Sequence, residues 1–337
     1  CESNQFAKEY LTLYPQANIL ATSPNDFKKA NRRRLISKIA LGDWTSVIIP
    51  YSVLGMIPLK PSTEISMLEK NLEELNATLA FYEKNEARIS IKEMEKAKEN
   101  FQAKIKELSN RRVDDGLLYW EDLGITNIIV DEAHNYKNLF FPKKLQVAGV
   151  SNTAAKKSQD LFNKISQHTE MFGEGHVVFS TATPISNSMV EMFTMMKYLN
   201  EQGLERHGID NFDAFAANFG EIIANMEIDP TGKGFRLNRR FAKFCNLPEL
   251  VTLFRQVADV VNIQDIADLD IPKHISGKPN VVTVYPSEAM EEYIDELVER
   301  ARLISQGNVN PKEDNMRERY VTATNHEENV TKAVAGA

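Results

Sequence analysis

Two successive carboxylates follow a short apolar run near the middle of the sequence. Asp131 and Glu132 come directly after residues 128–130 (Ile-Ile-Val), and Ala133 and His134 follow them. The apolar run predicts a buried strand, and α/β folds place their ligands at the carboxyl ends of such strands. In an NTPase, the first acid after the strand holds Mg²⁺, and the next orients or deprotonates the attacking water. The pattern therefore predicts metal binding at Asp131 and water activation at Glu132.

A second group of polar residues ends another apolar run. Residues 176–179 lead into Ser180, Thr181, Ala182, Thr183 and Pro184. Small hydroxyl side chains there can hydrogen-bond the strand that carries the acids and relay the state of the phosphate. Taken alone, the segment also fits an ordinary turn into a helix, with Thr183 as N-cap and Pro184 at the first helical position. The order of the two motifs, each at a strand end, favours a shared site.

The elements that must position these residues predict an α/β fold. Residues 18–23 and 46–51 indicate short buried strands joined by a basic helical stretch, as in a parallel sheet. Residues 63–110 carry apolar side chains at alternating spacings of three and four, which predicts an antiparallel coiled-coil hairpin. Ser90 and Glu93 are spaced as a capping box that would begin its second helix.

The second half of the sequence is expected to be mostly helical. Residues 186–199 fit an amphipathic helix, and residues 200–278 a helical region in which Phe212, Phe215 and Phe219 form a core stripe. Residues 281–304 fit a strand followed by a helix, as at the start of a second α/β lobe. The last thirty residues are polar and weakly patterned, which is typical of disorder.

Composition sets wider limits. The chain has 337 residues and a net charge of -7, which is ordinary for a globular protein and excludes a wholly basic surface. Two cysteines, Cys1 and Cys245, cannot build a disulfide framework, which favours the cytoplasm. Neither a signal peptide nor an apolar stretch of about 20 residues is present. The first residue is not Met, which suggests a chain that starts in mid-gene.

Positive charge is gathered locally in two segments. Residues 28–38 (KKANRRRLISK) include Arg32, Arg33 and Arg34, and residues 235–244 (FRLNRRFAKF) form the second patch. Each fits either a solvated helix face or a grip on phosphates.

Several of these segments resemble the motifs of one family. VDEAHNYKNL (130–139) looks like motif II of superfamily 2 helicases, with the Lys-Asn of the Swi/Snf branch. STATPISNSMVEMFTMMKYL (180–199) resembles motif III of that branch, and DWTSVIIPYSVL (43–54) resembles motif Ib. Residues 240–260 are similar to the large helicases of phages and conjugative elements, which are often fused to or encoded with adenine-specific DNA methyltransferases.

The resemblance implies roles for individual residues. Asp131 would bind Mg²⁺, Glu132 would activate water, and His134 would couple the nucleotide state to motif III. Thr181 and Thr183 would transmit that state. The residues expected to contact the DNA backbone are Tyr51, Ser52, Arg32, Arg33 and Arg34.

The resemblance also implies an architecture. Residues 1–200 would form part of a RecA-like ATPase lobe, with the hairpin (60–112) inserted. Residues 201–278 would be a helical region, and residues 279–337 the start of a second lobe with a polar tail. The cofactors would be ATP and Mg²⁺, and the partners double-stranded DNA and a fused or co-encoded DNA methyltransferase.

One motif of the family is missing from the sequence. The phosphate-binding loop G-x-x-x-x-G-K-[ST] does not occur, and residues 231–234 (Thr-Gly-Lys-Gly) have the wrong spacing. In the family this loop and motif Ia lie upstream of the matching segments. Motif VI is absent, and the sequence departs from the family pattern after Met316. The intact motor is expected to hydrolyse ATP and move on duplex DNA, whereas this chain alone should bind ATP weakly.

Two other interpretations remain open. The chain could be a non-catalytic DNA-binding or protein-docking module derived from a helicase lobe. It could also be a metal-dependent nuclease, although such enzymes normally carry a larger acidic cluster around two metals.

Overall fold

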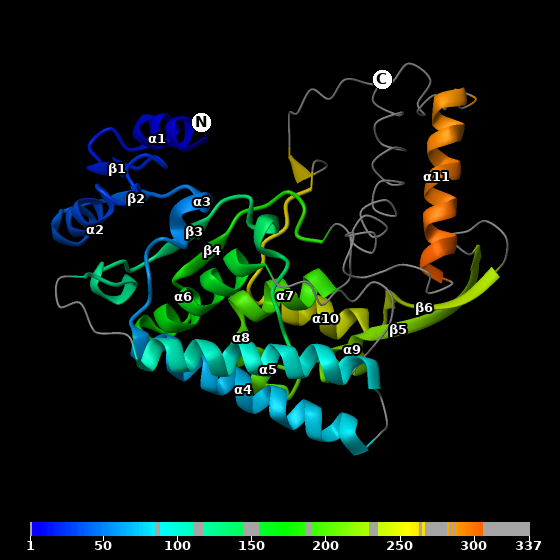
Figure 1. The fold of residues 1–337 in the computed structure, drawn as a ribbon. Coiled ribbons are helices and arrows are strands. Elements are labelled where there is room, and N and C mark those ends of the chain that lie inside the picture. Colours follow the sequence, from blue (N-terminus) through cyan, green and yellow to red (C-terminus); the bar gives the residue numbers. More distant parts are fainter. Residues whose placement is uncertain are drawn as a thin grey trace. The chain divides into compact units, whose positions relative to one another are not determined.

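The computed structural model describes residues 2–84, 88–110, 117–143, 155–185, 190–228, 235–262 and 287–305, with a few isolated positions between the last two ranges. Figure 1 shows its helices and strands. In chain order they are α1 (Glu2–Leu13), β1 (Ile19–Ala21), α2 (Arg32–Leu41), β2 (Ser46–Ile48), α3 (Tyr51–Leu54), α4 (Pro61–Lys84), α5 (Arg88–Ser109), η1 (Trp120–Asp122), β3 (Ile128–Val130), η2 (Ala133–Tyr136), α6 (Lys156–Phe172), β4 (Val177–Phe179), α7 (Val190–Leu199), α8 (Glu201–Arg206), α9 (Phe212–Phe219), β5 (Gly220–Ile228), β6 (Phe235–Phe244), α10 (Leu247–Arg255) and α11 (Glu288–Ser305).

Two pairs of parallel strands form the framework of the first part of the chain. β1 pairs with β2, and β3 pairs with β4, with Ile129 opposite Val178. In each pair a helix lies between the two strands along the chain, as parallel pairing requires. The expected α/β class with parallel strands is confirmed. Both pairs contribute to one core, whose largest buried members include Phe27, Ile36, Ile57, Tyr136 and Leu161.

The strand expected over residues 46–51 ends early. β2 stops at Ile48, and Pro50 stands as the N-cap of α3 with φ -63 and ψ 144. Proline has no N–H to donate to a strand ladder and suits the start of a helix. Tyr51 and Ser52 therefore lie in the first turn of a short helix, directly after the end of β2.

α4 and α5 lie side by side as the expected helical hairpin (Figure 1). Leu75, Leu79 and Met94 make a small core of their own, with Phe101 packed against it. The expected N-cap at Ser90 is wrong, because Ser90 lies inside α5, which is described from Arg88.

α7 is a buried helix rather than an amphipathic one. Eight of its ten residues are buried, since Met192, Phe193 and Met196 pack in one core while Tyr198 belongs to another. The Phe stripe of α9 is core, as expected, with Phe212 and Phe215 fully buried. The Asn211 side chain caps α9 by accepting the Ala214 N–H at 2.9 Å.

Residues 201–278 are not uniformly helical. α8, α9 and α10 fall in this range, but β5 and β6 pair as a two-stranded sheet between α9 and α10. The basic patch at 235–244 is therefore a strand, and the solvated helix face considered for it is wrong. Its alternating Phe235, Leu237 and Phe241 have the period of two that suits a strand.

The chain divides into two compact units. One comprises residues 1–223 and 241–258, and the other comprises residues 224–240 and 259–337. In the second unit, α11 matches the helix expected within residues 281–304. Most of the strand expected before that helix, and the polar tail after it, lie outside the described residues. None of the helices described here is long and apolar enough to cross a membrane.

Candidate functional site

The two polar motifs lie next to each other at the carboxyl ends of β3 and β4. The Ser180 N–H donates to the Val130 carbonyl at 2.8 Å, and the Ala133 N–H donates to the Ser180 carbonyl at 3.0 Å. These bonds continue the parallel ladder past the ends of both strands. They fix the backbone that carries Asp131 and Glu132 against the backbone that carries Thr181.

Glu132 turns the chain sharply out of β3. Its backbone is left-handed, with φ 44 and ψ 48, a conformation that residues other than Gly, Asn and Asp rarely adopt. Asn135 supports the turn, because its backbone N–H and its side-chain Nδ2 each donate to the Glu132 carbonyl at 3.0 Å. Both acidic side chains are exposed. Strain of this kind is concentrated at functional sites, where surrounding contacts maintain it.

His134 joins the two motifs. Its Nδ1 lies 3.1 Å from the Thr181 hydroxyl and 3.1 Å from Glu132 Oε2. The Thr181 hydroxyl also accepts the Thr183 N–H at 3.1 Å. The structure thus brings together four of the residues singled out in the sequence. Thr183 is not a helix N-cap, because residues 184–185 are bends and α7 is described only from Val190.

Tyr51 is turned toward the acids rather than simply outward. Its hydroxyl donates to the backbone carbonyl of Asp131, and its ring meets that of Tyr136 edge-on at 5.6 Å. The neighbouring Ser52 is exposed. α3 is therefore attached to the strand end that carries Asp131, and Ser52 is the member of the pair that faces solvent.

A buried ion pair under this region is absent from the sequence-based prediction. The fully buried Lys164 ammonium lies 2.5 Å from Asp160 Oδ2 and donates to the Leu54 carbonyl at 3.3 Å. Burial lowers the pKa of Lys164, and the Asp160 carboxylate opposes this effect. The hydrogen bond from Lys164 to Leu54 fastens α6 to α3. A Lys four residues after an Asp within one helix was the signal that could have revealed it.

The segment after η2 is tied to α7. The Tyr198 hydroxyl donates to the Ser158 carbonyl at 2.8 Å and lies 3.1 Å from the Tyr136 carbonyl. Burial raises the pKa of both tyrosines, so both remain protonated at neutral pH. Lys137 forms an ion pair with Glu191 of α7 at 2.9 Å.

The three arginines of α2 differ in their contacts and in their exposure to solvent. Arg32 turns inward, with its Nε donating to the Phe27 carbonyl at 3.2 Å and its Nη2 lying 3.7 Å from Met56 Sδ. Arg33 and Arg34 are exposed. The inward contacts bring the start of α2 close to the residues that follow α3.

The carboxylates of Asp131 and Glu132 suit a metal ion that takes only a few of its ligands from the protein. Mg²⁺ usually keeps several waters and binds one or two carboxylates together with substrate phosphates. Asp131 offers an exposed carboxylate whose Oδ1 accepts the Glu132 N–H at 3.0 Å. Among the described residues, no group of three or more His, Cys, Asp or Glu side chains could hold a metal ion by itself.

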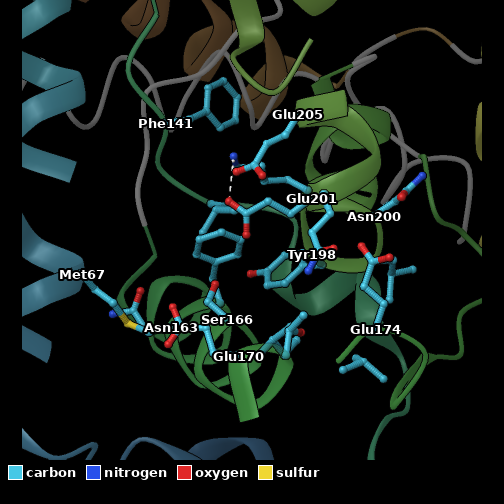
Figure 2. Close-up of a pocket in the computed structure, with 18 of the residues that line it drawn as sticks. Met67, Phe141, Asn163, Ser166, Glu170, Glu174, Tyr198, Asn200, Glu201 and Glu205 are labelled. Atoms are coloured by element: carbon cyan, nitrogen blue, oxygen red, sulfur yellow. Dashed lines mark ion pairs between the residues drawn. The ribbon is translucent and has the colours of Figure 1, made fainter. Parts of the chain in front are cut away.

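A cavity of about 610 Å³ lies elsewhere in this unit, between α4, α6, α7 and α8. Figure 2 shows Phe141, Tyr198 and several glutamates around it. Asp131, Glu132 and His134 are not among its lining residues. The chemistry-bearing residues therefore lie on an open strand edge rather than in this cavity.

Comparison with known proteins identifies the family. Residues 1–262 match the family described as "Probable helicase domain". The chain belongs to this helicase-domain family. It is also similar to the "Defense against restriction protein B" of Escherichia phage P1, with 26% identity over 160 residues. That match covers 46% of this helicase-domain chain and 7% of the phage protein. No solved structure matches the chain.

Proposed function

We propose that this helicase-domain chain is part of an ATP-driven motor that moves on double-stranded DNA. Within superfamily 2 we assign it to the Swi/Snf-like branch, with residues 1–200 as part of a RecA-like lobe. The observation that carries the proposal is the contact of His134 with both Glu132 and Thr181, each at 3.1 Å. It supports the proposal because it brings the Glu132 carboxylate and a hydroxyl-bearing loop together at adjoining strand ends, which coupling of hydrolysis to movement would require.

The chemistry follows from the positions of the side chains. Asp131 would hold Mg²⁺ with the ATP phosphates, and the metal would neutralise charge that develops on them. The exposed Glu132 carboxylate would accept a proton from the attacking water. His134 orients that carboxylate and, through Thr181, links its position to the loop after β4. Because the sequence lacks a phosphate-binding loop, we expect this chain alone to bind ATP weakly.

DNA contact is assigned to the exposed residues near α3. Ser52, Arg33 and Arg34 would meet the DNA backbone, which fixes position without reading sequence. Arg32 serves this surface indirectly, since its guanidinium is bound to Phe27 and Met56. The phage relative's name refers to defence against restriction. It supports a place among phage proteins. The assignment to the helicases of phages and conjugative elements, with a DNA methyltransferase as partner, rests on the resemblance of residues 240–260.

The DNA contact is tested by replacing charges. We expect the Arg33→Gln/Arg34→Gln variant of the chain to bind duplex DNA more weakly, with a shallower dependence of affinity on salt, by about one to two ions. Lys8→Gln, which removes a charge on α1, is the control. If the two variants bind duplex DNA with the same affinity and the same dependence on salt, α2 is not part of the DNA-binding surface.

The motor assignment is tested on the complete gene product. We expect duplex DNA to stimulate its ATP hydrolysis, without efficient strand separation in an unwinding assay. Efficient unwinding would overturn the translocase assignment and leave a helicase. Micromolar ATP binding by the present chain would contradict the weak binding expected here. Hydrolysis that is absent with and without DNA would favour the alternative of a DNA-binding or docking module.

A further inference from the structure

The segment after the acids is joined to α7 at three places. The Lys137 ammonium lies 2.9 Å from Glu191 Oε1, the Phe141 ring lies 5.0 Å from that of Phe193, and the Tyr198 hydroxyl lies 3.1 Å from the Tyr136 carbonyl. The ring contact and the hydroxyl contact are parts of the packed core. The ion pair is the contact of the three that carries charge.

The ion pair is shielded from water. The side chain of Lys137 is 18% exposed and that of Glu191 is 7% exposed. An exposed pair contributes little, but removal of one partner from a buried pair leaves an uncompensated charge. Glu191 also lies on a helix whose other buried residues are mostly apolar, and charged residues are rarely buried unless they are paired. In some proteins a buried ionic group fixes one arrangement of two segments, and this is the role considered for Lys137 and Glu191.

The two segments are those that carry the proposed site. Lys137 follows η2 directly, and η2 contains His134. Glu191 lies at the start of α7, which follows the loop that begins with Thr181. His134 and Thr181 hold the two segments together near the acids, at 3.1 Å. Lys137 and Glu191 hold the same two segments together a second time, farther along both.

We propose that Lys137 and Glu191 are a positioning pair that couples ATP hydrolysis to DNA binding. The inference rests on the proposed function. The pair sets where α7 lies relative to η2, and so keeps the Thr181 hydroxyl within reach of His134. Without it, His134 and Glu132 are still present, but their link to the loop after β4 is no longer held in place.

The test measures turnover of the complete gene product with and without duplex DNA. The ratio of DNA-stimulated to basal kcat does not depend on how much of the enzyme is folded, so it separates positioning from loss of folded protein. We expect Lys137→Gln and Glu191→Gln each to lower this ratio about ten-fold, with the KM for ATP changed less than about two-fold. The double variant Lys137→Glu/Glu191→Lys restores opposite charges and should recover most of the ratio.

An ion pair between α7 and α8 supplies the control. Lys197 and Glu201 lie 2.9 Å apart with side chains 14% and 24% exposed, but neither contacts the segment after the acids in any described hydrogen bond or ion pair. Lys197→Gln should leave the ratio unchanged. An unchanged ratio in Lys137→Gln, or an equal fall in Lys197→Gln, would overturn the inference. Glu132→Gln separates the two proposals. If it abolishes hydrolysis while Lys137→Gln has no effect, the motor assignment stands and the positioning pair fails.

Discussion

At the residue scale, Glu132 has a left-handed backbone conformation that a glutamate rarely adopts. β3 ends two residues before it, at Val130, and the residue after it, Ala133, is fully buried, with its N–H donating to the Ser180 carbonyl. The chain can make this turn only if Glu132 takes a left-handed backbone. The sequence predicted the carboxylates and their strand, but not this geometry, because nothing in the residue types favours positive φ at a glutamate.

The strained backbone at Glu132 predicts that a substitution which relieves it will increase stability and abolish activity. We expect Glu132→Gly to raise the free energy of unfolding by about 1 kcal/mol, because glycine adopts this conformation without a Cβ clash. Urea unfolding of the chain measures the gain, and ATP hydrolysis by the complete gene product should be lost in the same variant. A variant less stable than the native protein would show that the turn is not strained.

His168 predicts a pH dependence of stability. It is 2% exposed on α6 with its ring 4.8 Å from that of Phe172. Burial lowers its pKa, backbone groups of Thr126 and Ile125 oppose this, and His176 reinforces it. The unfolded chain therefore binds the proton first as pH falls below about 6.5, and stability decreases from there toward the lower pKa of the folded state.

Replacing His168 with phenylalanine removes the imidazole that takes up this proton. His168→Phe should lose less stability than the native chain when urea unfolding is compared at pH 7.5 and pH 5.5. His207→Gln, which removes an exposed imidazole elsewhere in the same unit, is the control. The same loss in His168→Phe and in the native chain would show that His168 is not the group responsible.

At the scale of elements, periodicity predicted some parts better than others. The hairpin of α4 and α5 and the Phe stripe of α9 follow from apolar spacing, which is set within each segment. The strands β5 and β6 were missed, because a helical preference was assumed across a region whose pairing is set between segments. The same reason hid the contacts of Tyr51 with Asp131 and of Lys164 with Leu54, which join residues far apart in the sequence.

The hairpin predicts a local loss of structure. Leu75 is fully buried in its small core with Leu79 and Met94. We expect Leu75→Ala to destabilise the hairpin by about 3 kcal/mol. Amide hydrogen exchange should accelerate in α4 and α5 while β3 and β4 keep their protection, because their core is a separate one. Faster exchange throughout the first unit would contradict this separation.

At the scale of the whole molecule, the comparison shows the family, and the motor is a proposal that rests on the site. The chain belongs to a helicase-domain family, and its acids, His134 and Thr181 adjoin at two parallel strand ends. Predicting this adjacency from sequence was possible because parallel strands place their carboxyl ends at one edge. The contacts that hold α3 and α7 against that edge could not be predicted from the sequence, because they depend on how the helices pack.

The most direct test compares the complete gene product with its Glu132→Gln variant in an ATP hydrolysis assay, with and without duplex DNA. Glutamine keeps the shape of the side chain and removes the carboxylate that would accept the proton from water. The account predicts hydrolysis that duplex DNA stimulates in the native protein and that falls at least about a hundred-fold in the variant. Equal hydrolysis by both proteins, or hydrolysis indifferent to DNA, would contradict it.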